Sequence, residues 1–558
     1  MTTVLLAEQV QPGPTSDSPP TGGRISSRSR DGCWICRDKK VKKKCDQQRP
    51  RCGRCVKHKL SCDYSPRPTL AERRRASQDI VIVQAANDVP NDTTNLLPAS
   101  PIGLPIVTGA WSRNLSTEDK EAIAYFRTGF AESHHTKNPD YGLISLMFRI
   151  AQQEEMVMHM VIAIGLHEMD FRRLRPTARQ TSLRHYATAL RLMAVAITSP
   201  EKAKDTDSIY TTLWLMLLYE QQFGDAECRA YVHHLEGISS LLQHQGGRLL
   251  TLSPRKPGTV NRTSGFLGNS TEKATSKMSV YSARVLVWIA LLDAAAASSG
   301  VGGQVNSTIL ALMIGDTSTP KVQVEDPVKT FTRLHRYSNS LYRTAWGDAY
   351  PQNELVDDVE NRSIYALLCA CAQLRFMTAQ LATIYRRGSP AAAQNSIDVG
   401  NSIAEVGDLF VELLEVASEL SPNTNNSHRL VANVRAIVPM YYAVILDFDR
   451  LTAFDEPLGE RQQCAVEEIM NLACQGYEHD GDEAIIRVAW PLFIVALETD
   501  DLGHRKWILD RFEAISKFGK NFQRAHQFLL GAIPIQDRLR VRIDLRDQME
   551  KTAFFVLG

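Results

Sequence analysis

Apolar residues follow a helical period over most of the chain from residue 112 to residue 558. Four apolar side chains recur at intervals of three and four in residues 184–197, namely Tyr186, Leu190, Met193 and Ile197. This spacing predicts an amphipathic helix whose four apolar residues face the core. Residues 207–223 are apolar on nearly every side, which predicts a central buried helix that begins with Asp207 as its cap.

Two further segments, residues 363–387 and residues 507–532, show the same helical pattern, and alternating β-branched runs are scarce. The fold class expected for residues 112–558 is therefore all-α, a large domain of stacked helix pairs. Cys369 and Cys371 lie two positions apart on one of these helices, and we expect them to be small core residues.

Residues 1–30 and residues 65–111 show no sustained apolar period. The first segment is rich in Pro, Gly, Ser and Thr and predicts a disordered N-terminus, and the second predicts a linker that is basic and then flexible. Arginines interrupt the few apolar positions of the linker, so no long coiled coil is expected. Binding as a monomer and homodimerisation through the large domain both stay open. The segments expected are 1–30, a cysteine-rich module at 31–64, the linker at 65–111 and the helical domain at 112–558.

Neither a membrane anchor nor a secretion signal is expected. The longest apolar runs, such as the one that begins at Val285, are shorter than a membrane-spanning helix requires. The first residues lack the basic start and the long apolar core of a signal peptide. We therefore expect an intracellular protein with no membrane partner.

The charges of the chain are unevenly distributed, although its net charge is only +2. Residues 33–75 contain 15 Lys and Arg and four Asp and Glu, which gives this segment +11 and leaves −9 for the rest of the chain. A basic segment attached to an acidic body is typical of a polyanion-binding module. A solvated lysine-rich loop would explain the charge, but it would not explain the cysteines that lie among the lysines.

Six cysteines lie in this basic segment, whereas the other 528 residues of the chain hold only five: Cys33, Cys36, Cys45, Cys52, Cys55 and Cys62. Their spacing, C-x2-C-x8-C-x6-C-x2-C-x6-C, repeats a C-x2-C pair followed by a more distant cysteine. A reducing compartment disfavours disulfides, whereas C-x2-C pairs place two thiolates on one metal. One tetrahedral Zn²⁺ would leave two thiolates idle, but two Zn²⁺ use all six if two thiolates bridge both ions. This arithmetic predicts two Zn²⁺ per chain.

The segment resembles the binuclear zinc cluster of fungal transcription factors. The resemblance rests on "CWIC" with a basic run behind it, "CD", "RPRC", "CGRC" and "SCDY". It implies a small two-zinc module with two short helices, in which individual residues take these roles: Cys33 and Cys52 bridge the ions, Cys36 and Cys45 complete one site, Cys55 and Cys62 complete the other, and Pro50 turns the loop between the halves. One departure is that eight residues, "RDKKVKKK", separate the second and third cysteines, where the family usually has six.

The resemblance also implies how the module binds double-stranded DNA. A short helix begins near Cys36, and Lys39 and Lys40 read bases from it, typically a CGG triplet in the major groove. The chemistry fits, because guanine presents two acceptors there and lysine is a donor only. Arg37 lies on the same helix and belongs to the DNA-binding set. The other basic residues are expected to contact phosphates, which position the protein without specifying sequence: Lys42, Lys43, Lys44, Arg51, Arg54 and Lys57.

The large helical region resembles the fungus-specific transcription factor domain in its second variant. The segments that carry this resemblance are "HYATALRLM", "LMLLYEQQFGDAECRAYVHHLEGISSLL" and "AWPLFIVALETDDLGHRKWILDRF". The resemblance implies a regulatory role without catalytic chemistry. The sequence itself offers histidine pairs and "LHEMD", but no second histidine follows His167 at the spacing of a zinc peptidase. We therefore expect satisfied core or surface histidines, no catalytic residues and no enzyme.

These observations favour a nuclear, sequence-specific DNA-binding regulator of RNA polymerase II transcription. Its zinc cluster would read a short GC-rich element, its helical domain would meet the transcription machinery or co-regulators, and its targets would form a metabolic gene set. Activation and repression both stay open. The alternative is a zinc-dependent protein-interaction module that does not bind DNA, which gives no reason for lysines between the metal ligands.

Overall fold

The computed structural model describes residues 45–49, 51–57, 62, 115–172, 179–199, 205–246, 278–314, 327–424, 429–454 and 456–558. It divides the chain into two compact units, residues 1–97 and residues 98–558. In the described residues of both units, the regular secondary structure is helical and no β-strand occurs. This confirms the mainly α fold class.

The described part of the first unit contains one helix, α2 (Gly53–Lys57). A second short helix was expected near Cys36, which lies outside the described residues.

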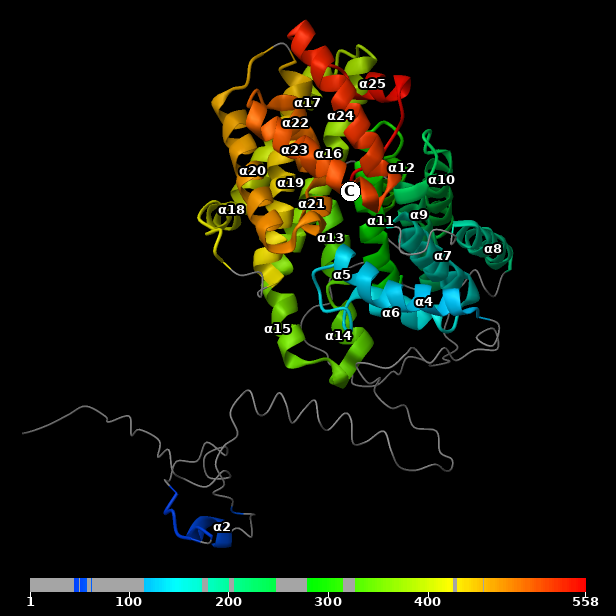
Figure 1. Cartoon of the computed structure of the whole chain (residues 1–558), viewed down its shortest axis with the longest axis vertical. Helices are drawn as coiled ribbons and strands as arrows, with labels where there is room; N and C mark the ends of the chain where they lie inside the picture. Colours follow the sequence, from blue (N-terminus) through cyan, green and yellow to red (C-terminus); the bar gives the residue numbers. More distant parts are fainter. Residues whose placement is uncertain are drawn as a thin grey trace, which may run out of the picture. The chain divides into compact units, whose positions relative to one another are not determined.

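The second unit is a stack of helices (Figure 1). Its first half comprises α4 (Thr117–Tyr125), the π-helical turn η2 (Phe126–Phe130), α5 (Ala131–His134), α6 (Leu143–Ala151), α7 (Glu155–Phe171), α8 (Arg179–Thr198), α9 (Thr206–Phe223), α10 (Arg229–His244), α11 (Val280–Ser298), α12 (Gln304–Ile314), α13 (Pro327–Ser338), α14 (Leu341–Trp346) and the 3₁₀ turn η5 (Gly347–Ala349). Its second half comprises α15 (Gln352–Glu360), α16 (Arg362–Arg386), α17 (Ala392–Leu409), α18 (Val411–Ser418), α19 (Arg429–Thr452), α20 (Glu460–Asp480), α21 (Asp482–Arg487), α22 (Ala489–Glu498), α23 (Leu502–Ile515), the 3₁₀ turn η6 (Ser516–Phe518), α24 (Lys520–Leu539) and α25 (Leu545–Lys551).

Two hydrophobic cores organise this unit. The first is built mainly from helices α4 to α12, and the second mainly from helices α16 to α25. In Figure 1, α7 to α10 lie on one side and α17 to α20 on the opposite side, with α11, α13 and α16 between them. Alanines of α11 and α16 form a third buried cluster at this junction, together with Leu310 of α12 and Phe376 of α16, so the two central helices approach each other closely.

The helix at 207–223 is buried as the sequence predicts, but its cap is a different residue. Helix α9 begins at Thr206, and the side chain of Asp205 accepts a hydrogen bond from the Ser208 amide as the N-cap. Asp207 lies inside the first turn, where it accepts hydrogen bonds from Ser279 and Ser282 at the start of α11. The prediction of Asp207 as the cap is therefore wrong, because an aspartate two residues earlier reaches the free amide.

The buried face of α8 also differs from the prediction. Tyr186 and Met193 are buried, but Leu190 and Ile197 are 38% and 46% exposed. The positions that pack inward are mostly small: Ser182, Tyr186, Ala189, Met193 and Ala196. Short side chains allow α8 to lie close to α7, and the larger residues are left on the outer face.

The segment 507–532 folds as parts of two helices. Helix α23 ends at Ile515 and α24 begins at Lys520, with Gly519 as its N-cap residue. A Cβ on Gly519 would come within 3.2 Å of the Gln222 carbonyl oxygen, so the close approach of α9 explains the glycine at this break. Helix α16 follows the predicted segment 363–387, and Cys369 and Cys371 are buried core residues as predicted.

Three helices are long and apolar enough to cross a membrane by length and composition, which corrects the expectation that no apolar segment reaches that length. They are Val280–Ser298, Arg362–Arg386 and Arg429–Thr452. In the structure, 78%, 61% and 67% of their apolar windows are buried inside the helical unit. The central helices of a large all-α domain are apolar on most sides because other helices surround them.

Candidate metal centre and DNA-binding module

The short helix α2 brings two of the predicted metal ligands together. Cys52 directly precedes the helix and Cys55 lies within it, and both residues are fully buried. A spacing of three residues places two side chains on the same side of a helical turn. The Cys55 amide donates a hydrogen bond to the Cys52 sulfur at 3.4 Å, and the Cys52 amide donates one to the Cys62 sulfur at 3.2 Å. Such N–H donors favour the thiolate form that a metal requires.

Cys52, Cys55 and Cys62 form a group with the dimensions of a zinc site. Their Sγ atoms lie within 4.8 Å of one another. Tetrahedral zinc–thiolate bonds of about 2.3 Å place sulfur atoms about 3.8 Å apart. The donor set therefore fits a Zn²⁺ ion after small side-chain adjustments.

A second group contains Cys45, Asp46 and Cys52, whose ligand atoms also lie within 4.8 Å of one another. Cys52 belongs to both groups, which is the position expected of a ligand shared by two ions. Of the six predicted cysteine ligands, the structure thus brings together Cys45, Cys52, Cys55 and Cys62. Cys33, Cys36 and the predicted loop residue Pro50 lie outside the described residues.

Asp46 was not among the site residues expected from the sequence. Its Oδ2 atom accepts a hydrogen bond from the Gly53 amide at 2.9 Å, and its Oδ1 atom accepts one from the Gln48 amide at 3.5 Å. A Cβ on Gly53 would lie 2.7 Å from Asp46 Oδ2, so the glycine allows this approach. Asp46 therefore ties the loop after Cys45 to the first turn of α2. The sequence signal for this role of Asp46 is an aspartate that is followed by a short polar loop and a glycine.

Three of the predicted DNA-binding residues are described, and all lie at or on α2. Arg51 and Lys57 are exposed, whereas Arg54 is half-buried. The exposed pair places positive charge on the same small module as the packed cysteines. The other predicted DNA contacts lie outside the described residues: Arg37, Lys39, Lys40, Lys42, Lys43 and Lys44.

His167 and His234 lie in the core and His233 lies on the surface, in line with the prediction of core or surface histidines. His167 is buried, its Nδ1 atom lies 2.7 Å from the Tyr219 hydroxyl, and its ring stacks on Phe223. The adjacent His233 and His234 point in different directions, since His233 is exposed and His234 lies 2.7 Å from the Tyr186 hydroxyl. Burial lowers the pKa of His167 to about 3 and that of His234 to about 4, so both rings are neutral near pH 7.

Both parts of the chain match known protein families. Residues 31–71 match the fungal Zn(2)-Cys(6) binuclear cluster domain. Residues 125–532 match the fungal specific transcription factor domain, which covers most of the chain. No solved structure matches the chain.

Curated relatives share short stretches with this protein. The chain is 38% identical over 85 residues to the oleate-activated transcription factor 1 of Saccharomyces cerevisiae, which is 15% of this chain and 8% of that protein. It is 45% identical over 49 residues to a Zn(2)-C6 fungal-type transcription factor of Gibberella zeae, which is 9% of this chain and 10% of that protein. It is 49% identical over 49 residues to the sterol uptake control protein 2 of Candida albicans, which is 9% of this chain and 7% of that protein.

The matched stretches thus span about a tenth of these relatives or less. The family assignment therefore rests on the domain matches. The fungal specific transcription factor domain covers residues 125–532, and the binuclear cluster domain covers the clustered cysteines. The matched domains belong to transcription factors and not to enzymes. The chain therefore belongs to the zinc-cluster family of fungal transcription factors.

Proposed function

We propose that residues 31–64 bind two Zn²⁺ ions through six cysteines, with Cys33 and Cys52 shared between the ions. The support is that Cys52 lies in both groups of candidate ligands, while Cys55 and Cys62 join only one of them. Cys33 and Cys36 would complete the donor set. Bound zinc would supply the folding energy of a segment too short to bury a large core.

This module recognises a short GC-rich element of the CGG type in double-stranded DNA. The observation that carries the proposal is that the packed cysteines and the exposed Arg51 and Lys57 occur on one small module. Arg51, Arg54 and Lys57 act as phosphate contacts, together with Lys42, Lys43 and Lys44. Lys39 and Lys40 act as the base contacts, and Arg37 lies beside them. Phosphate contacts provide affinity, and base contacts provide the sequence preference.

The protein acts in the nucleus as a regulator of RNA polymerase II transcription, and its helical unit meets the transcription machinery or co-regulators. A metabolic gene set is the target class that we propose. A repressor would use the same DNA-binding module, because the partners of the helical unit decide between activation and repression. A zinc-dependent module that binds only protein is the less favoured alternative, since fifteen basic residues crowd around its ligands.

A comparison of two lysine variants tests the DNA-binding proposal. Lys40→Ala should weaken binding to the preferred site by about 1–3 kcal/mol and should relax the sequence preference. Lys57→Ala should weaken binding to all sequences alike and reduce the salt dependence. Binding is measured by fluorescence anisotropy with the zinc-loaded full chain on the preferred site and on single-base variants.

Two outcomes would contradict the proposal. An equal loss on every sequence in Lys40→Ala would make Lys40 a phosphate contact. Absence of any sequence preference in the unsubstituted, zinc-loaded protein would favour the protein-interaction alternative.

A further inference from the structure

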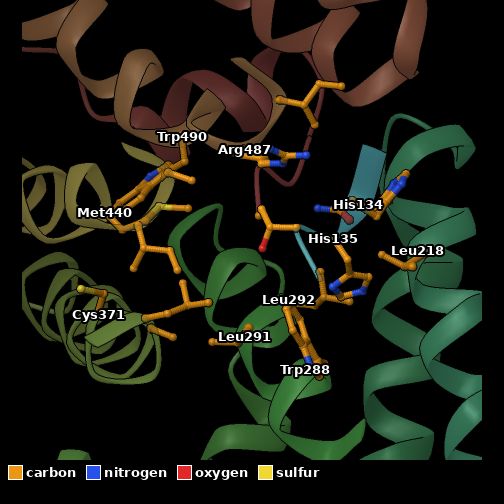
Figure 2. A pocket seen from close by; sticks show the side chains of 18 of the residues that line it. His134, His135, Leu218, Trp288, Leu291, Leu292, Cys371, Met440, Arg487 and Trp490 are labelled. Atoms are coloured by element: carbon orange, nitrogen blue, oxygen red, sulfur yellow. The ribbon is translucent and has the colours of Figure 1, made fainter. Parts of the chain in front are cut away.

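A cavity of about 240 Å³ lies inside the helical unit (Figure 2). Residues of α9, α11, α16, α19 and α24 line it, so it lies where the first hydrophobic core meets the second. One buried water needs only about 10–15 Å³, and this space is many times larger. Its size approaches that of pockets that hold small organic molecules.

One part of the wall is apolar and aromatic. Figure 2 shows Cys371, Met440 and Trp490 on one side of the cavity, with Leu291 and Trp288 below them. Three of the seven tryptophans of the chain line the cavity: Trp214, Trp288 and Trp490. Flat aromatic and aliphatic side chains favour an apolar occupant over free water.

Polar groups without partners lie in the same wall. Trp214 Nε1, Gln222 Oε1 and Asn521 Oδ1 are buried atoms with no hydrogen-bond partner. The exposed fractions of these residues are only 3%, 7% and 2%. His135 Nε2 and Arg487 Nε in the same wall also lack partners. An unsatisfied buried polar atom costs roughly 1–3 kcal/mol, so the folded chain retains several such costs around one cavity.

The hydrogen bonds around Gln222 support its assignment as an acceptor. His134 Nδ1 lies 3.0 Å from the Phe130 carbonyl oxygen, which requires the proton on Nδ1. The other nitrogen, His134 Nε2, then accepts a hydrogen bond from Gln222 Nε2 at 2.8 Å. Gln222 Oε1 is left to accept a hydrogen bond from an occupant, whereas the Trp214 N–H is left to donate one.

The charges of the wall restrict the occupant further. Among the lining residues, Arg375 and Arg487 are cationic and no Asp or Glu is present. The Arg375 guanidinium lies 3.8 Å from the centre of the Trp490 ring and donates a hydrogen bond to the Leu557 carbonyl oxygen. In Figure 2, Arg487, His134 and His135 lie on the side opposite Met440 and Cys371. The two arginine side chains, of which Arg487 is also paired with Asp480, make the wall less favourable for a cationic head group than for a hydroxyl or a carboxylate.

We propose that this cavity binds a small, largely apolar molecule with one polar oxygen head, either an alcohol or a carboxylate. The apolar body packs against Met440, Trp288 and Trp490, and the head meets Trp214, Gln222 and Asn521. Binding to this cavity does not require DNA recognition, so it can be tested separately from the function proposed above.

The surrounding contacts indicate how an occupant affects the whole helical unit. Segment 552–558 returns into the interior, where Gly558 lines the cavity and Phe555, Val556 and Leu557 are at most 2% exposed. The Val556 carbonyl oxygen accepts hydrogen bonds from Gln221 and Asn521, which themselves line the cavity. A molecule in the cavity therefore contacts both cores and this segment, and it should stabilise their packing against one another.

The test uses three probes that differ only in their head: 1-octanol, octanoate and octane. Each is titrated into the zinc-loaded full chain below its solubility limit, with tryptophan emission and the unfolding temperature as readouts. We expect saturable binding and a raised unfolding temperature with 1-octanol or octanoate. Octane should bind at least roughly fivefold more weakly, because it leaves the polar atoms unpaired. The better of the two polar probes identifies the type of head.

Variants in the wall separate this cavity from nonspecific apolar binding. Ala436→Phe fills the apolar side and should abolish binding, while Ala432→Phe, one turn earlier on α19 and outside this cavity, should retain it. Met440→Trp is a second filling variant in case Ala436→Phe does not fold, as judged by circular dichroism. Trp214→Phe keeps the ring but removes the donor, so it should reduce the advantage of the polar probes over octane.

Three results would overturn the proposal. The first is the absence of saturable binding by any probe, which would mean that water fills the cavity. The second is unchanged binding in folded Ala436→Phe and Met440→Trp. The third is equal affinity for octane and both polar probes. A failure of DNA binding in the same preparations would concern the zinc module instead.

Discussion

Cys52 is the residue on which the two halves of the metal centre converge. Its sulfur lies in the group with Cys55 and Cys62 and also in the group with Cys45 and Asp46. It is fully buried, and its sulfur accepts a hydrogen bond from the Cys55 amide. Loss of this side chain removes a donor from both groups at once, whereas loss of Cys62 affects one group only.

We therefore expect Cys52→Ala to lose both Zn²⁺ ions and Cys62→Ala to retain about one. Zinc per chain is measured by elemental analysis of the purified full-length variants. Cys464→Ala is the control, because Cys464 is exposed on α20 of the helical unit. Equal zinc content in Cys52→Ala and Cys62→Ala would contradict a shared ligand at residue 52.

His167 shows how burial at a single residue sets the response of the fold to pH. Its ring is 3% exposed and stacks on Phe223 with ring centres 3.9 Å apart. Burial, with smaller contributions from Arg179 and Lys520, lowers its pKa from 6.5 to about 3. Between pH 3 and pH 6.5, His167 binds a proton in the unfolded chain but not in the folded chain. The contribution of His167 to stability is therefore present above pH 6.5 and is lost as the pH falls.

His167→Phe should remove this dependence. Between pH 7.5 and pH 5, the unsubstituted protein should lose about 2 kcal/mol more unfolding free energy than the variant. Urea denaturation at the two pH values measures the difference, and the constant cost of losing the Tyr219 contact cancels in the comparison. His233→Phe is the matched control, since the His233 side chain is 85% exposed. A pH dependence that is the same in His167→Phe and in the unsubstituted protein would rule out this role.

At the scale of the helix, the start of α9 carries two aspartates with separate tasks. Asp205 caps the helix through the Ser208 amide and hydroxyl. Asp207 accepts hydrogen bonds from Ser279 and Ser282 and thereby joins the first turn of α9 to the first turn of α11. One residue stabilises its own helix, and the other stabilises the contact between two helices.

A double-mutant cycle distinguishes these tasks. Asp205→Ala should cost about 1 kcal/mol of unfolding free energy, and this cost should be nearly the same in the Ser282→Ala background. Asp207→Ala should instead be coupled to Ser282→Ala by about 0.5–3 kcal/mol. Chemical denaturation of the three single and two double variants provides the values. Coupling of Ser282 to Asp205 but not to Asp207 would reverse the assignment.

At the scale of the whole molecule, the two units differ in charge and in the domain family that each one matches. Residues 33–75 carry a net charge of +11 and the rest of the chain carries −9. We therefore expect DNA to repel the acidic body, so that the body should add no phosphate contacts. The matched domains fall in separate units, the zinc cluster at 31–71 and the fungal specific domain at 125–532.

A fragment of residues 1–111 should therefore bind a single half-site with an affinity within a few-fold of that of the full chain, at matched salt. Deletion of residues 112–558 should at the same time abolish or deregulate transcription. A gel-shift titration and a reporter assay provide the two measurements. A fragment that binds a hundredfold more weakly would show that the helical unit contributes to DNA binding, for example by dimerising the zinc modules.

Much of this molecule is determined by local features that the sequence displays. The ligand spacing marks the metal centre, because thiolate chemistry permits few other uses for six closely spaced cysteines. Helical periodicity marks the all-α unit, and the burial of α9, Cys369 and Cys371 follows from apolar residues on every side. These features depend on neighbours in sequence, so no knowledge of the tertiary fold is needed to predict them.

Other features depend on which segments meet, and only the tertiary structure decides them. Leu190 and Ile197 have the same periodicity as Tyr186, yet α7 packs against the face with the smaller residues and leaves the two larger ones exposed. Asp207 acquires its role from the start of α11, more than seventy residues away. Residues of α9, α11, α16, α19 and α24 line the cavity, and the sequence of no single one of these helices predicts it. The unpaired atoms of Trp214 and Gln222 on α9 and of Asn521 on α24 line one cavity only when the two cores pack together, because the two helices are far apart in the chain.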